Sequence, residues 1–101
     1  MIGKATTIWQ QISPGVKMSM GARQPVGNED TGYLHFQVGP ERGGWMFKVC
    51  VQLNSMDTYV LRLVRIETST RAVMELDAIE GLYCDDLNET LLRWEGQFLV
   101  S

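Results

Sequence analysis

The sequence predicts an α+β fold: an antiparallel β-sheet of about five strands, with a short N-terminal helix and a C-terminal helix packed on one face. Apolar and polar residues alternate over residues 33–38, 45–53 and 58–66, which is the period of strands that bury one face. From Tyr83 onward, apolar residues instead recur at intervals of three and four, the period of a helix. The turns between the strands are short, and short connections favour antiparallel neighbours.

The chain length and composition fit one folded unit. With 101 residues, of which 45% are hydrophobic and 21% charged, we expect a single domain over residues 1–101 with a core of its own. Cys50 and Cys84 lack the spacing of a metal or redox motif, so we expect free thiols. No apolar run approaches a membrane span, and the first residues do not resemble a signal peptide. We therefore expect a cytoplasmic protein.

The first third of the chain carries weaker signals. Residues 5–12 show helical spacing, and the Ser-Pro-Gly sequence at residues 13–15 should end that helix. Residues 17–20 alternate polar and apolar side chains, which predicts a short strand with both methionines on one face. Residues 21–32 are rich in Gly, Pro, Asn and Asp, and this composition predicts a loop.

The middle of the chain should form the rest of the sheet. In the last predicted strand, Ala72, Met74 and Leu76 would point inward. We expect strands over residues 33–38, 45–53, 58–66 and 71–76, separated by turns over residues 39–44, 54–57 and 68–70.

The C-terminal helix should cover the apolar face of the sheet. Leu87, Leu91 and Trp94 continue the helical spacing from Tyr83, and Gly96 suits its end. The covered face would consist of Met18, Phe36, Phe47, Val49, Leu61 and Leu63.

The net charge of −3 is unevenly distributed. Seven of the 12 carboxylates lie after residue 74, where Arg93 is the only Lys or Arg. Asp85, Asp86 and Glu89 fall in the first turns of the predicted helix, where carboxylates are favoured. They form either a solvated helix end or a surface for a basic protein partner. The spacing of a calcium loop is missing, so we expect no metal.

The polar face of the sheet is a second candidate surface. If the register holds, this face is cationic and contains aromatic rings, and it has three interpretations: a solvated surface, a protein interface, or a platform for single-stranded nucleic acid. The acidic net charge argues against tight nonspecific DNA binding. Its members would be Lys17, Tyr33, His35, Lys48, Gln52, Arg62 and Arg71.

The sequence offers little catalytic chemistry. His35 is the only histidine, and a catalytic histidine needs a nucleophile and an orienting carboxylate that no motif identifies. The glycines of residues 39–44 lack the lysine that follows a phosphate-binding loop. We therefore expect neither an enzyme nor a cofactor.

Several segments together resemble a family of small proteins encoded by bacteriophages, prophages and plasmids. The sequence departs from the family at Met20, where relatives have threonine, and at residues 95–98, where they have T-G-L-Y. The family has no established activity, so the resemblance implies a mobile-element accessory protein and no catalytic residues. The matching segments are IWQQI at residues 8–12, KMSMGA at 17–22, GYLHFQV at 32–38, VQLNSMDTY at 51–59 and EGLYCDDL at 80–87.

These observations favour a non-enzymatic binding module of a phage or plasmid that contacts a host or defence-system protein in the bacterial cytoplasm. An anti-CRISPR-type inhibitor would fit. The alternatives are a nucleic-acid-binding regulator that uses the basic sheet face, and a virion or assembly component. A homodimer is a further expectation, because the edge strands of so small a sheet need protection.

Overall fold

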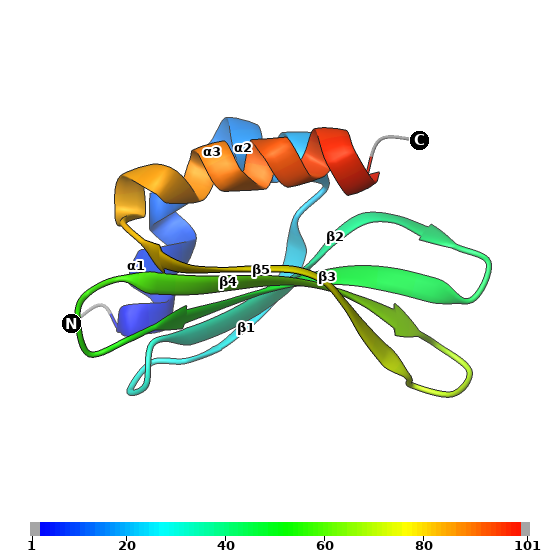
Figure 1. Ribbon diagram of the computed structural model, residues 1–101, viewed down its shortest axis with the longest axis horizontal. Helices are drawn as coiled ribbons and strands as arrows, with labels where there is room; N and C mark the ends of the chain where they lie inside the picture. Colours follow the sequence, from blue (N-terminus) through cyan, green and yellow to red (C-terminus); the bar gives the residue numbers. More distant parts are fainter. Residues whose placement is uncertain (1–2, 100–101) are drawn as a thin grey trace.

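A computed structural model gives the fold of residues 3–99, with the side chains of residues 41 and 42 outside the description. It confirms the predicted α+β class: a five-stranded antiparallel sheet carries helices from both ends of the chain on one face (Figure 1). In chain order the elements are α1 (Lys4–Gln11), α2 (Pro14–Met20), β1 (Arg23–Asn28), β2 (Tyr33–Arg42), β3 (Trp45–Leu53), β4 (Tyr59–Glu67), β5 (Val73–Leu82), α3 (Cys84–Trp94) and a π-helical turn η1 (Glu95–Leu99).

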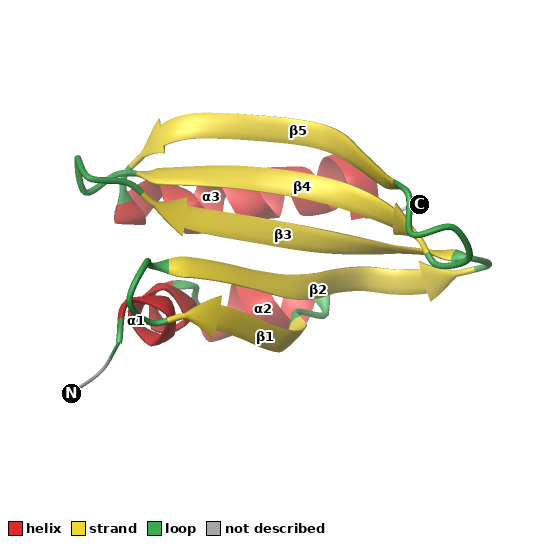
Figure 2. Cartoon of the chain, turned by 90° about the horizontal axis from the view of Figure 1, so that it is seen from below, coloured by secondary structure: helices red, strands yellow, loops and turns green. Residues whose placement is uncertain are grey.

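The strands lie in sequence order from β1 to β5, each antiparallel to the next. From below, the strands lie in front of α3, with their other face uncovered (Figure 2). The register sets Val49 opposite Phe36 on one side and Leu63 on the other, and all three side chains are fully buried. This is the face that the helices cover.

The core forms where α3 meets this face. Leu87, Leu91 and Trp94 of α3 are fully buried, as the helical spacing predicted, and Ile8 of α1 joins them. Each such side chain contributes roughly 1.5–3 kcal/mol when it leaves water. The one wrong member of the predicted covered face is Met18, which is 83% exposed.

The predicted strand over residues 17–20 is wrong, because this segment belongs to helix α2. Ser13 is its N-cap and accepts a hydrogen bond from Val16 N, while Pro14 takes the first helical position, where its missing N–H costs nothing. Val16 and Met20, four residues apart, face the core. Four residues of alternation are too few to separate a strand from a short helix.

The predicted loop over residues 21–32 is also wrong in part, because it contains the edge strand β1. Pro25 is tolerated there, since an edge strand leaves N–H groups without a neighbouring strand. At Gly27 an added Cβ would lie 2.6 Å from the Cβ of Ala5. That glycine therefore allows helix α1 to approach the sheet closely, rather than marking a turn.

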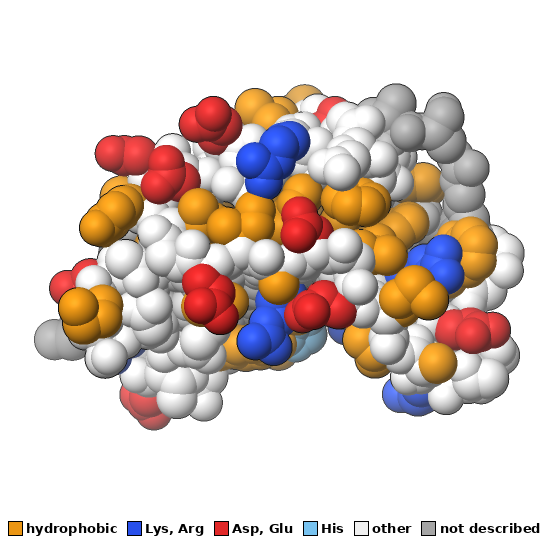
Figure 3. Space-filling view, in the orientation of Figure 1, with side chains coloured by type: hydrophobic (Ala, Val, Ile, Leu, Met, Phe, Trp, Pro, Cys, Tyr) orange, Lys and Arg blue, Asp and Glu red, His pale blue; other side chains and the backbone are white. Residues whose placement is uncertain are grey.

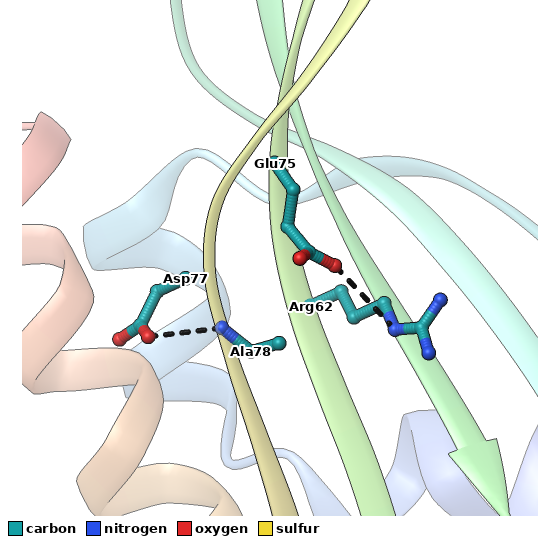
Figure 4. A network of polar contacts seen from close by, with 4 residues as sticks. All are labelled: Arg62, Glu75, Asp77 and Ala78. Carbon is teal, nitrogen blue, oxygen red and sulfur yellow. Dashed lines mark hydrogen bonds and ion pairs between the residues drawn. The ribbon is translucent and has the colours of Figure 1, made fainter.

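Strand β5 contains an extra residue that decides which way its side chains face. Leu63 pairs with Asp77 and Val64 with Glu75, so two steps along β5 match one step along β4 and Leu76 forms a β-bulge. Asp77 and Glu75 consequently point to opposite faces of the sheet (Figure 4). Of the predicted inward set, Ala72 precedes the strand and is exposed and Met74 is 52% exposed, whereas Leu76 is half-buried and packs against the core, as predicted.

The C-terminal helix begins one residue after Tyr83, and Asp86 accepts a hydrogen bond from Tyr83 N at 3.1 Å. It does not stop at Gly96, because the chain continues as η1 and buries Leu99. Among residues 3–99, no helix has both the length and the apolar character needed to cross a bilayer.

Candidate functional site

The uncovered face of the sheet is hollowed. The molecule is indented on its underside, where Lys or Arg side chains and a histidine are visible (Figure 3). The hollow has a volume of about 660 Å³, within the range of ligand-binding pockets. We call it the open hollow. Its lining residues are Tyr33, His35, Lys48, Cys50, Gln52, Val60, Arg62, Val64, Ile66, Val73 and Glu75.

The strand register arranges these side chains in rows across the sheet. One row runs from His35 through Cys50 to Arg62. The next runs from Lys48 through Val64 to Glu75, and the one beyond it, from Met46 through Ile66 to Val73, is wholly apolar. The polar centre of the open hollow therefore lies beside an apolar shelf, the row of Met46, Ile66 and Val73, of which Ile66 and Val73 line the hollow.

Two cations and one carboxylate lie at the polar centre. Arg62 Nε is 3.6 Å from Glu75 Oε1, and both side chains are more than half exposed (Figure 4). Lys48 pairs with Val64, two residues from Arg62, so Lys48 and Arg62 are diagonal neighbours across the sheet. An exposed ion pair contributes little to stability, so Arg62 can change partners at low cost.

Tyr33 and His35 form the aromatic side of the open hollow. Their ring centroids are 5.8 Å apart, and the rings are tilted by 51°. Burial, followed by the neighbouring Cys50 thiol, raises the pKa of Tyr33 to about 12. Burial and then the positive charge of Lys48 lower the pKa of His35 below 6.5. At neutral pH both side chains are therefore uncharged.

Cys50 and His35 are paired across β2 and β3, which sets a thiol next to an imidazole. A base in such a pair is normally helped by a neighbour that stabilises its protonated form, as a carboxylate does. The charged neighbour of His35 is instead Lys48, which disfavours that form. The local electrostatics suit binding better than proton transfer.

Of the predicted polar face, five residues line the open hollow: Tyr33, His35, Lys48, Gln52 and Arg62. Lys17 is not among them, because it belongs to α2 and places its ammonium 4.3 Å from the centroid of the Trp9 ring. Trp9 in turn packs against the buried Phe36, so Lys17 lies on the helix side of the sheet. Arg71 lies in the turn before β5, also outside the lining.

The predicted acidic residues lie on α3, across the sheet from the open hollow. Asp86 is half-buried and closes the helix N-terminus through Tyr83 N, while Asp85 and Glu89 are exposed. Within the described residues, no three His, Cys, Asp or Glu side chains are grouped in a way that could hold a metal ion.

The sequence reasoning missed the apolar part of the open hollow. Val60, Val64 and Ile66 share a face with Arg62, and the alternation along β4 could have identified them. Glu75 lies on this face too, and the predicted inward direction of Met74 already places it outward, although it was not counted among the site residues. Comparison of the chain with models of protein families, with curated proteins and with solved structures found no match in any of the three.

Proposed function

We propose that the protein is a non-enzymatic binding module of a phage or plasmid, and that it uses the open hollow to contact a host or defence-system protein. The observation that carries the proposal is the combination of a concave shape, apolar lining and few charges on one uncovered sheet face. Fully solvated sheet faces are predominantly polar, whereas protein interfaces combine apolar and aromatic residues with Arg.

The arrangement supports a protein partner over nucleic acid. Lys48 and Arg62 are the two Lys or Arg side chains in the lining, and Arg62 already has Glu75 beside it. Nucleic-acid surfaces need many phosphate contacts, since each one contributes a share of the affinity. With Lys17 and Arg71 outside the open hollow, the basic-face hypothesis loses two of its cations.

The test is affinity capture from the bacterial host with two matched variants. Val64→Glu places a carboxylate at the centre of the open hollow, and Leu92→Glu places one at a 48% exposed position on α3. We expect a host protein to co-purify with the wild type and with Leu92→Glu but not with Val64→Glu. Circular dichroism should show that both variants are folded.

Two results would overturn the proposal. One is a partner that both variants retain equally, which would place the contact elsewhere. The other is a nucleic acid in place of a protein, bound with the steep salt dependence of phosphate contacts.

A further inference from the structure

We infer that the open hollow recognises an extended acidic segment in which a carboxylate lies two residues from an apolar side chain. This inference rests on the proposed function and names the chemistry of the partner.

The charges select an anion. Lys48 and Arg62 are diagonal neighbours, roughly 7–8 Å apart at the backbone, so one carboxylate held between them can contact both. Glu75 meets Arg62 from the side of β5, at 3.6 Å. Glu75 pairs with Arg62 as a partner carboxylate would. The two carboxylates therefore compete for Arg62.

The row spacing selects the position of the apolar residue. The row of Lys48 and the row of Met46 and Ile66 are two residues apart along the strands. Side chains two apart in any extended segment point the same way and are separated by about 7 Å. Consider a partner segment that lies along the strands and places a carboxylate between Lys48 and Arg62. The side chain two residues from that carboxylate then lies on the apolar shelf.

The same geometry disfavours a polyanion. A nucleic acid brings a charge at every phosphate, and beyond the two cations it would meet Glu75 and the apolar shelf. The net charge of −3 adds repulsion at long range. A short acidic peptide carries only one or two carboxylates, and the two cations of the open hollow can pair with them.

The experiment is selection of random displayed dodecapeptides on the immobilised full chain, followed by sequencing. We expect enrichment of Asp or Glu two positions from an aliphatic or aromatic residue. Retention of the selected peptides should fall about tenfold on the Lys48→Gln, Arg62→Gln double variant. It should stay unchanged on the control Lys4→Gln, Arg93→Gln, which removes two exposed cations outside the open hollow.

Glu75 provides a second measurement with the opposite sign. Glu75→Gln frees Arg62 and should raise retention about threefold, while Glu89→Gln, an equal charge change on α3, should leave retention of the same peptides largely unchanged. Equal gains in retention for Glu75→Gln and Glu89→Gln would mean that retention depends on net charge and not on the release of Arg62, which would overturn the inference.

The outcomes separate this inference from the proposed function. Selected peptides that lose binding with Val64→Glu but are basic or uncharged would overturn the inference and leave the binding module standing. Failure to select any peptide whose retention depends on Val64 would overturn the inference, while host capture would still decide the proposed function.

Discussion

Asp77 connects the edge strand to the core through a single side chain. Its Oδ2 accepts a hydrogen bond of 2.9 Å from Trp94 Nε1, and Trp94 is fully buried. Its Oδ1 accepts a second bond, from Ala78 N, at 2.9 Å (Figure 4). The carboxylate thus satisfies an indole N–H that would otherwise have no water available to it.

Asp77→Ala should lower the free energy of unfolding by about 1–3 kcal/mol, because it leaves the indole N–H of Trp94 buried without an acceptor. Urea unfolding followed by tryptophan fluorescence measures the change. Asp77→Asn keeps a carbonyl acceptor and should lose less. Equal midpoints for the wild type and both variants would show that the bond contributes nothing.

His35 should make stability depend on pH. Its pKa is lowered by burial and then by Lys48, so the unfolded chain takes up this proton at a higher pH than the folded protein. The protein therefore loses stability as the pH falls from 6.5 toward the pKa of His35 in the folded state. Above pH 6.5 this loss is absent.

The check is to compare urea midpoints above and below pH 6.5 in the wild type and in His35→Gln. The variant should lose less stability on acidification, because carboxylate titration affects both proteins alike. Parallel losses would remove His35 as a cause.

At the scale of elements, the N-terminal helices depend on a small polar junction. Ser13 caps α2, and its own N–H donates to Asn88 Oδ1 of α3 at 2.8 Å. Asn88 Nδ2 donates to Gln11 O at the end of α1, at 3.1 Å. One amide side chain of α3 therefore holds the turn between α1 and α2.

Ser13→Ala should destabilise the protein by about 1 kcal/mol through loss of the cap on α2. The measurement is the urea midpoint, with Ser55→Ala, in the exposed β3–β4 turn, as the control. A midpoint equal to that of the control would contradict the role of Ser13.

The elements differ in how far the sequence predicts them. Strand β3 has the predicted bounds of residues 45–53, because nine residues of alternation fix both its period and its face. Helix α2 and strand β1 were missed because each is short and contains glycine and proline. Helix α2 packs against α3, and β1 pairs with β2 and packs against α1; local composition does not encode these contacts.

The residues of the candidate site also differ in how far the sequence predicts them. Tyr33, His35 and Lys48 were placed on one face correctly, because regular alternation extends along β2 and β3. Lys17 was misplaced together with its helix, and the inward position of Asp77 could not be predicted because a bulge has no period in the sequence. Most of the apolar lining of the open hollow lies on β4 and follows from its alternation, whereas the place of Val73 beside Ile66 depends on the register of β4 and β5.

At the scale of the whole molecule, both edges of the sheet carry features that oppose pairing with another strand. Strand β1 is short and contains Pro25, and β5 is bulged and carries Glu75 and Glu80. A second copy paired antiparallel about the centre of β5 would set Glu75 against Glu80, and like charges in that position repel. Edge protection, the original reason to expect a homodimer, is therefore met within one chain.

We accordingly predict a monomer, to be checked by sedimentation equilibrium. Replacing both Glu75 and Glu80 with valine should promote association through β5, because it removes the repulsion and adds strand propensity. A wild type that dimerises as readily as the double variant would contradict this reasoning.

Because of the extra residue at Leu76, strand β5 should tolerate a substitution better than a change in its length. Between the hairpin turn and the bulge, substitutions alter only the outer end of the strand, and the buried pairing of Asp77 with Trp94 continues undisturbed. Deleting one residue there would instead exchange inside for outside along that segment and turn the carboxylate of Glu75 away from Arg62. Point substitutions can therefore change the outward side chains of β5 while its register is kept. A single deletion would remove the carboxylate of Glu75 from the open hollow.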